Sequence, residues 1–280
     1  FDIVPVAVAN LPDGRLITWS SRFHDTFTEE GVGQTFTQIF DPSSGQPLPR
    51  AVSQTDHDMF CPGINNLADG RILSAGGTSS ERTSIYDPAS GTWSADDNMN
   101  ITRGYQGNVT LSDGSVFTIG GSWSDGYTNF GGRDAEQWTP ETGWFLLPGI
   151  KSELLWNAND LAQEARGIYR VDNHVWLWAA PNGKIFHAGP GERMHWIDVA
   201  NGGSWTDAGQ RGNDTYSMKG TTVMFDIGKI LKVGGARSYD SDTPAKDNSF
   251  VIDINNGDNA TVTPTGNNLD LSRTMHNSTV

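Results

Sequence analysis

Cysteine and basic residues are scarce in this chain of 280 residues. There is a single cysteine, Cys61, so no disulfide can form within the chain, and the thiol is inert, intermolecular or chemically special. Lys and Arg number 19 against 33 Asp and Glu, a formal net charge of -14. That charge argues against nucleic acid or an anionic membrane surface as a partner, since both need basic patches. No apolar run approaches the length of a membrane span.

Helical patterns are almost absent as well, and the stretch 152–165 is the best candidate. In their place the chain has 33 Gly, 10 Trp and many Asp, Asn and Ser. This composition predicts short strands joined by tight turns. The length is sufficient for one large β domain with a substantial core.

One pattern recurs five times along the chain. It reads as a strand, a turn that is typically Asp-Gly or Asn-Gly, and a second strand that usually closes on Gly-Gly. The copies are 10–21, 66–77, 110–121, 180–190 and 225–235. Asp-Gly and Asn-Gly fit the two positive-φ positions of a type I′ hairpin turn. The closing glycines are expected where backbones crowd together.

Each copy continues into a third strand, a short turn such as 86–91, and a fourth strand. Self-similarity at about 40 to 50 residues, with four strands in each unit, is typical of a β-propeller. The Gly-Gly closure with a trailing aromatic residue resembles the kelch repeat. A β-sandwich with Gly-rich turns is the alternative, which five matching copies disfavour. The predicted fold class is therefore all-β, a kelch-type β-propeller.

The repeats do not finish within the chain. A further copy opens at 272–280 and stops in mid-strand, and the longer spacing around 146–166 indicates a loop insertion. A propeller of about five blades and part of another would expose apolar sheet edges. We therefore expect residues 1–280 to be an incomplete propeller domain whose remaining blades lie in a C-terminal part outside this chain.

Several features indicate a secreted, extracellular glycoprotein. Five Asn-x-Ser/Thr sequons permit N-glycosylation in a secretory context. They begin at Asn100, Asn108, Asn213, Asn259 and Asn277. The chain opens at Phe1 rather than Met and runs straight into an alternating apolar segment, so a processed or trimmed N-terminus is expected.

Four ordered motifs resemble galactose oxidase and its relatives, the copper-radical alcohol oxidases, whose propellers have seven blades. The motifs are His57-Asp58-Met59-Phe60-Cys61-Pro62-Gly63, Arg103-Gly104-Tyr105-Gln106, Thr118-Ile119-Gly120-Gly121-Ser122-Trp123-Ser124 and Tyr169-Arg170-Val171-Asp172-Asn173-His174. The resemblance runs from about residue 3 to the end of the chain. It places the chain in the N-terminal and central part of the family's catalytic domain.

The resemblance implies a redox cofactor made from Cys61 and Tyr105. In the family the cysteine sulfur is bonded to the ring carbon ortho to the tyrosine hydroxyl, giving a thioether-linked tyrosyl radical beside a copper ion. Sulfur donates electron density into the ring, and a phenolate is a hard ligand suited to Cu(II). Tyr105 would thus be both catalytic and a metal ligand. Without the resemblance, Cys61 reads as a small buried hydrophobe and Tyr105 as an ordinary strand tyrosine.

Three further residues match the family's site. Trp123 matches the tryptophan that stacks over the thioether and shields the radical, while Phe27 and Arg170 match a substrate-binding phenylalanine and arginine. An arginine offers a rigid fork of donors to vicinal hydroxyls, and a phenyl ring offers an apolar face to a sugar. Without the resemblance these would be a core aromatic, a loop hydrophobe and a surface ion pair.

The sequence also departs from the family pattern. The galactose-specific members have a glutamine where Arg166 stands, and a Tyr-Gln pair near 238–240 is only partly present. The resemblance further implies that a second tyrosine and both copper-binding histidines lie outside this chain. None of the chain's 6 histidines matches a ligand position.

The resemblance implies a copper-radical oxidase that converts a primary alcohol, favoured to be the C6 hydroxyl of galactose or a galactoside, to the aldehyde while O2 is reduced to H2O2. Activity is expected to need the C-terminal part. The expected partners are the alcohol, O2 and that remaining polypeptide, with no nucleic acid and no membrane. The alternatives are an aryl or other primary alcohol oxidase of the same family, and a non-catalytic kelch module that binds glycans or protein.

Overall fold

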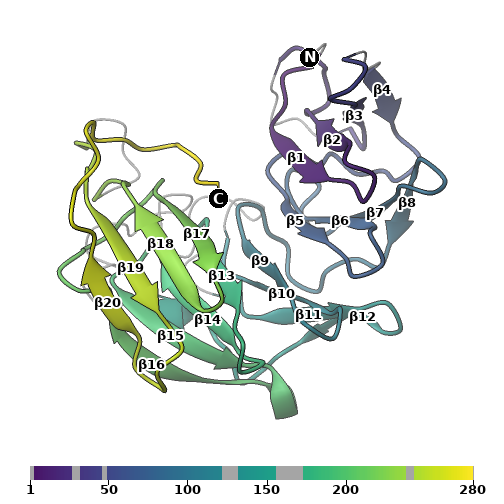
Figure 1. The fold of residues 1–280 in the computed structure, drawn as a ribbon. Coiled ribbons are helices and arrows are strands. Elements are labelled where there is room, and N and C mark those ends of the chain that lie inside the picture. Colours follow the sequence, from purple (N-terminus) through teal and green to yellow (C-terminus); the bar gives the residue numbers. More distant parts are fainter. Residues whose placement is uncertain are drawn as a thin grey trace. The chain divides into compact units, whose positions relative to one another are not determined.

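A computed structural model describes most of the chain. The described residues are 3–26, 32–45, 49–121, 132–155, 173–237 and 243–279. Their regular structure is almost entirely β, in five four-stranded antiparallel sheets (Figure 1). The helical turns described are two 3-10 segments, η1 (Ser152–Leu155) and η3 (Ala200–Gly202). The candidate helix at 152–165 therefore begins as a single 3-10 turn, and its remainder lies outside the described residues. None of the helices found there is long and apolar enough to cross a membrane.

Each sheet follows one repeat of the sequence, and its strands pair in chain order. The first sheet consists of β1 (Ala7–Asn10), β2 (Leu16–Trp19), β3 (Thr35–Phe40) and β4 (Pro49–Val52). The second consists of β5 (Gly63–Asn66), β6 (Ile72–Ala75), β7 (Thr83–Asp87) and β8 (Thr92–Asp96). The third consists of β9 (Gly107–Thr110), β10 (Val116–Ile119), β11 (Glu136–Thr139) and β12 (Gly143–Leu146).

The fourth sheet consists of β13 (Trp176–Ala179), β14 (Ile185–Gly189), β15 (Arg193–Asp198) and β16 (Ser204–Gln210). The fifth consists of β17 (Thr221–Asp226), β18 (Lys229–Val233), β19 (Ser249–Asp253) and β20 (Thr261–Pro264). Five such meanders with almost no helix are the blades of a β-propeller, which confirms the predicted fold class.

The blades belong to two compact units. The first unit holds nearly all of β1 to β12, and the second holds β13 to β20. Within the first unit β1 lies against β5 and β5 against β9, and within the second β13 lies against β17. The first strands of consecutive blades are therefore neighbours, as radial repetition of a blade requires.

Apolar cores lie between consecutive blades inside each unit. Trp19 of the first blade meets Trp93 of the second edge to face, with ring centroids 5.5 Å apart. Leu73 and Val116 belong to a cluster between the second and third blades. Burying such side chains supplies about 1.5–3 kcal/mol each. Trp93, which trails the turn at 86–91, thus packs between blades.

The hairpin turns are not of the predicted type I′. The Gly14 N–H donates to the Leu11 carbonyl at 3.0 Å, and the Leu11 N–H donates to the Arg15 carbonyl at 2.8 Å. Only the glycine has a positive φ, 84°. This is a type I turn closed by a glycine bulge, in which the Asp13 carboxylate accepts the Arg15 N–H at 3.0 Å. The same pair of backbone bonds recurs at Gly70, Gly114 and Gly183.

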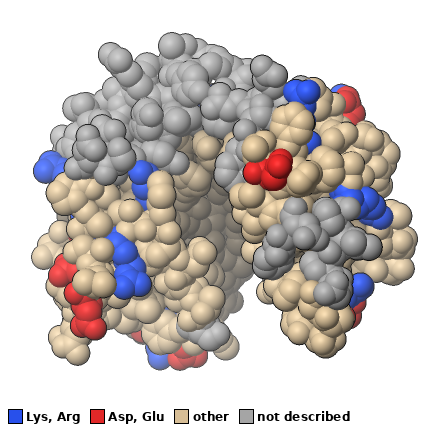
Figure 2. Space-filling view, turned by 90° about the horizontal axis from the view of Figure 1, so that it is seen from above, with Lys and Arg blue, Asp and Glu red and all other residues tan. Residues whose placement is uncertain are grey.

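Charged side chains are scattered on the face shown in Figure 2. Small groups of Lys and Arg alternate there with small groups of Asp and Glu on a mostly uncharged surface. The described residues on this face form no continuous patch of one sign.

Candidate functional site

A left-handed residue precedes the first strand of each blade from the second to the fifth. Cys61, Tyr105, His174 and Lys219 have φ values of 60°, 58°, 51° and 56°. Each stands two residues before its strand, β5, β9, β13 or β17. Met275, with φ 52°, stands at the same place in the copy that opens at 272. A positive φ strains any residue with a side chain, so its recurrence at one repeat position shows that the blade junction imposes it.

The segment that carries Cys61 is fixed by the first blade. The Thr35 hydroxyl donates to the His57 carbonyl at 2.9 Å and accepts the Met59 N–H at 2.8 Å. The Trp19 indole N–H donates to the Met59 carbonyl at 3.0 Å. These groups are buried, so the hydrogen bonds hold the backbone ahead of the cysteine in one position.

Gly76 and Gly77, which follow β6, hold the cysteine and tyrosine segments close together. The Gly77 N–H donates to the Arg103 carbonyl at 3.0 Å. A Cβ atom on Gly76 would lie 2.2 Å from that same carbonyl oxygen, and one on Gly77 would lie 2.3 Å from the Phe60 carbonyl oxygen. Only glycine fits between the two segments, which explains the Gly-Gly closure of this repeat.

A buried ion pair holds the turn that carries Tyr105. Arg103 Nη2 lies 2.9 Å from Glu136 Oε1, and both side chains are completely buried. The Glu136 carboxylate also accepts the backbone N–H groups of Asn100 at 2.8 Å and Ile101 at 2.9 Å. A buried pair of charges is stable only with such additional hydrogen bonds. The pair therefore anchors the turn to the third blade.

Cys61 and Tyr105 are in direct contact. The Tyr105 N–H donates to the Cys61 carbonyl at 3.1 Å. Burial raises the pKa of the Cys61 thiol to about 11; a side-chain hydrogen bond from Tyr105 opposes this, and the charge of Asp58 adds to it. The two side chains therefore lie within reach of each other beside this backbone hydrogen bond. The structure thus places a protonated thiol against a tyrosine side chain.

Asp58 gives this site a buried carboxyl group. Asp58 is 0% exposed, and its Oδ1 accepts the Phe60 N–H at 3.3 Å. Within the described part of the chain, Oδ2 has no hydrogen-bond partner. Burial raises the pKa of Asp58 to about 6, against the opposing effects of the Phe60 N–H and the charge of Arg22. The carboxyl group therefore titrates near neutral pH.

His57 has a structural role beside the site. Its Nε2–H donates to the Gly76 carbonyl at 2.9 Å, so Nδ1 accepts the Ser84 hydroxyl, also at 2.9 Å. Burial lowers the pKa of His57 to about 4. Among the residues that the structure describes, no group of three or more His, Cys, Asp or Glu could hold a metal ion. Of the predicted site residues, Tyr105 is the candidate copper ligand found there.

The other predicted site residues lie outside the described ranges. These are Phe27, Trp123 and Arg170, together with Arg166 and positions 238–240. Their roles in shielding the radical and binding the substrate stay predictions.

Sequence reasoning missed a histidine pair in the fourth blade. Register places His187 of β14 directly opposite His195 of β15. Their Nδ1 atoms are 2.9 Å apart, with ring centroids 5.2 Å apart and ring planes inclined by 16°. The two nitrogens therefore face each other, and one ring donates its Nδ1–H to the Nδ1 of the other. Their positions on facing strands of one hairpin were the available signal, but using it required the exact register.

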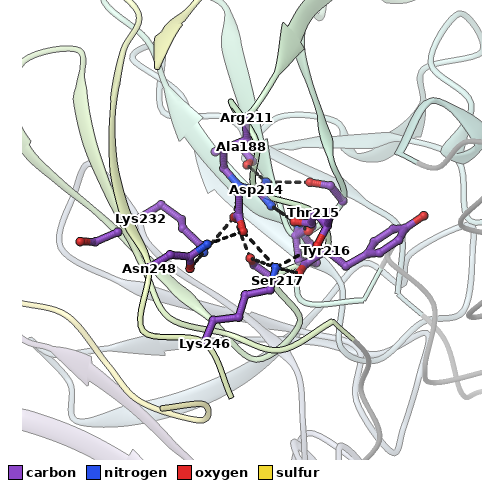
Figure 3. A network of polar contacts seen from close by, with 12 residues as sticks. Ala188, Arg211, Asp214, Thr215, Tyr216, Ser217, Lys232, Lys246 and Asn248 are labelled. Carbon is purple, nitrogen blue, oxygen red and sulfur yellow. Dashed lines mark hydrogen bonds and ion pairs between the residues drawn. The ribbon is translucent and has the colours of Figure 1, made fainter. Parts of the chain in front are cut away.

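A second buried polar cluster, shown in Figure 3, connects the fourth blade to the fifth. The Asp214 carboxylate lies 2.9 Å from Arg211, 2.8 Å from Lys232 and 3.0 Å from Lys246. Two neutral side chains also donate to it. Both carboxylate oxygens are fully used within the protein, so we interpret the cluster as a structural connection rather than a ligand site.

No family model matches the chain. Two curated galactose oxidases from Gibberella zeae are each 39% identical to it over 287 aligned positions, covering 99% of this chain and 41% of the relative. The chain thus spans less than half the length of these curated relatives. A solved structure described as a novel fungal alcohol oxidase with catalytic diversity among the AA5 family, in complex with copper, is 36% identical, with a TM-score of 0.86. That match covers 98% of this chain and 56% of the other.

Proposed function

Along nearly all of its 280 residues this chain is related to the galactose oxidase family, and on that premise we propose that it forms part of a copper-radical oxidase. The proposed reaction converts a primary alcohol, the C6 hydroxyl of galactose or of a galactoside, to the aldehyde while O2 is reduced to H2O2. The observation that carries the proposal is the contact between Cys61 and Tyr105, in which the Tyr105 N–H donates to the Cys61 carbonyl at 3.1 Å and the two side chains interact.

Cys61 and Tyr105 are proposed to become covalently linked. The new bond joins Sγ to the ring carbon ortho to the hydroxyl and replaces the S–H and C–H bonds. Two protons and two electrons are released, and O2 accepts them as H2O2. The contact between the two segments keeps sulfur beside the ring before the link forms.

Tyr105 is the residue of this chain that would hold copper, through its phenolate oxygen. The fit is partial but chemically sound: the side chain is half-buried, and a phenolate is a hard oxygen ligand suited to Cu(II). Bound copper supplies one-electron redox chemistry to the site. We propose that a second tyrosine and two histidines in a C-terminal part outside this chain complete the ligand set.

In the proposed reaction Tyr105, once linked to sulfur and oxidised, would take a hydrogen atom from the carbinol carbon. The hydroxyl proton passes to a base outside this chain. The alcohol loses two electrons and two protons in all, which reduce O2 to H2O2. We propose that Trp123 excludes water from the linked ring, while Phe27 and Arg170 orient the sugar.

The test is the covalent link itself. Intact mass and a tryptic map of the full-length protein are recorded before and after copper is added in air. We expect a loss of about two hydrogens, with the Cys61 and Tyr105 peptides travelling as one. Tyr105→Phe is the control, because it keeps the thiol and ring but removes the hydroxyl. A Cys61 that can still be alkylated after copper loading sinks the oxidase proposal and leaves the non-catalytic kelch module.

A second candidate keeps the chemistry and changes the substrate to an aryl or other primary alcohol. Arg166 departs from the galactose-specific pattern, and the similar solved structure is described as an alcohol oxidase with catalytic diversity. Turnover of galactose, raffinose and benzyl alcohol by the full-length enzyme separates the two. Faster turnover of benzyl alcohol than of either sugar favours the second candidate.

A further inference from the structure

We propose that a groove between the first blade and the β7–β8 turn binds an acidic sugar. The groove has a volume of about 370 Å³, and Arg15, Arg50 and Tyr86 are among the residues that line it. All of them belong to the first unit, and the proposal does not depend on the oxidase chemistry.

Two arginines and one tyrosine line this groove together. Burial raises the pKa of Tyr86; the charges of Arg15 and Arg50 oppose this, and those of Asp13 and Asp87 add to it. Arg50 Nη2 also donates to the Gly91 carbonyl at 3.0 Å, and this hydrogen bond joins β4 to the β7–β8 turn. The three side chains are therefore held at the same place.

Both guanidinium groups keep spare donors. A guanidinium has five N–H bonds. Arg15 uses Nε on the Asp13 carboxylate at 2.7 Å, and Arg50 uses one N–H on Gly91. Within the part of the chain that the structure describes, their other N–H groups have no protein acceptor. A paired set of unused arginine donors is notable in a chain whose formal net charge is -14.

The repeat provides an internal comparison. A second groove of about 330 Å³ lies between the second and third blades. There Arg71 pairs with Asp69 at 2.7 Å, just as Arg15 pairs with Asp13. Its lining adds Asp113 and Glu141 and no second arginine. The two grooves thus differ in charge, because two arginines and one carboxylate line the first, and one arginine and three carboxylates line the second.

The lining selects the kind of ligand. A single arginine can bind a carboxylate through two parallel N–H bonds. The groove also contains Asp41, and hydrogen bonds from Ser43 lower the pKa of that carboxyl, so it stays ionised and can accept hydroxyl protons. Ile39 and the Tyr86 ring supply apolar surface. A volume near the lower end of ligand sites suits one sugar ring. These features fit a hydroxylated monocarboxylate such as galacturonate.

Calorimetric titration of the full-length protein with galacturonate at low salt tests the proposal. Arg50→Gln removes one arginine, and since Arg50 makes a single backbone hydrogen bond, the variant is expected to fold. The control is Arg71→Gln in the second, more acidic groove. We expect saturable binding that weakens about tenfold or more in Arg50→Gln and is unchanged in Arg71→Gln. Unfolding temperatures of both variants confirm that they are folded.

Three results would overturn the proposal. They are the absence of saturable galacturonate binding, binding that Arg50→Gln does not weaken, and equal weakening by Arg71→Gln. Inorganic sulfate is titrated in parallel. If sulfate binds as tightly as galacturonate and with the same dependence on Arg50, the groove takes a bare oxyanion and the sugar assignment is wrong.

Discussion

Tyr105 and Cys61 occupy equivalent places in consecutive blades, and the Tyr105 N–H donates to the Cys61 carbonyl at 3.1 Å. Each is a left-handed residue two positions before the first strand of its blade. Because β5 and β9 are neighbours, residues at the same offset before them are neighbours too. The contact between thiol and phenol thus follows from the periodicity of the fold.

Loss of the buried charge of Arg103 should destabilise the first unit. In Arg103→Met the Glu136 carboxylate remains completely buried without its cation, and we expect the free energy of unfolding to fall by about 3–5 kcal/mol. Urea denaturation measures it. Arg71→Met, which breaks the exposed pair with Asp69, is the control and should cost under about 1 kcal/mol. A similar loss of free energy of unfolding in the two variants would mean that burial does not increase the contribution of the Arg103–Glu136 pair to stability.

Asp214→Asn should have a comparable effect in the second unit. The substitution leaves Arg211, Lys232 and Lys246 without their shared carboxylate, so we expect a loss of about 3–5 kcal/mol in urea unfolding. Asp226→Asn, which removes an exposed pair with Lys229, serves as the control. An unchanged unfolding midpoint for Asp214→Asn would contradict the structural role of the cluster.

The histidine pair of the fourth blade should make stability depend on pH. Burial lowers the pKa of His195 to about 4 and that of His187 well below 6.5, so the folded protein keeps both rings neutral. The unfolded chain takes up protons below its ordinary pKa of about 6.5. The contribution of the histidine pair to the free energy of unfolding is therefore fully present above that pH and is lost as the pH falls toward 4.

Thermal unfolding of the wild type and of His195→Asn from pH 8 to pH 4 measures this contribution. The variant should be less stable at pH 8, because the shared hydrogen bond is gone, yet its disadvantage should shrink as the pH falls. A constant difference at every pH would show that the pair does not titrate on unfolding.

Asp58 should control the reactivity of Cys61 in the metal-free protein. Its negative charge helps to raise the pKa of the thiol, so Asp58→Asn should lower that pKa and speed alkylation at pH 9 about threefold or more. Asp56→Asn, at an exposed carboxylate paired with Arg82, should leave the rate unchanged. Equal rates in the wild type and Asp58→Asn would place the carboxyl group too far from sulfur to matter.

Glycosylation should be restricted to three sequons if, as we propose, the protein is secreted. The amide nitrogen of Asn100 donates to Glu136 and to the Trp144 carbonyl, and that of Asn108 donates to Asn65. Attaching a glycan there would break these bonds.

The remaining sequons, at Asn213, Asn259 and Asn277, are exposed, as Asn100 is, but within the described part of the chain their amide groups make no such hydrogen bonds. Glycopeptide mapping of protein from a eukaryotic host should find glycans only at these three. A glycan on Asn108 would contradict the observed packing of that side chain.

The repeat pattern predicted the number and content of the blades because period and turn residues are local properties. The turn type was wrong because Asp-Gly suits two geometries, and the side-chain acceptor of Asp13 rather than a left-handed aspartate decides between them. The ion pair of Arg103 with Glu136 was missed because it joins residues 33 apart in sequence.

The candidate site was predicted from a resemblance, since one cysteine and one tyrosine form no pattern by themselves. The structure explains why the two residues meet, through a spacing that is visible in the sequence. Cys61 and Tyr105 each stand two residues before a glycine that begins the first strand of a blade. The histidine pair could not be found this way because a slip of one residue in register would separate the rings. The roles of Phe27, Trp123 and Arg170 remain predictions.

The glycine pair at 76–77 lets the backbone segments that carry Cys61 and Tyr105 approach closely, so the backbone sets the distance between the thiol and the phenol. Any side chain added there must push apart the two segments that it would touch at 2.2 and 2.3 Å. If the proposed link between Cys61 and Tyr105 forms, its yield should respond to such a shift. The proportion of linked protein, measured by mass in a set of variants, would therefore report changes in the spacing of the second and third blades.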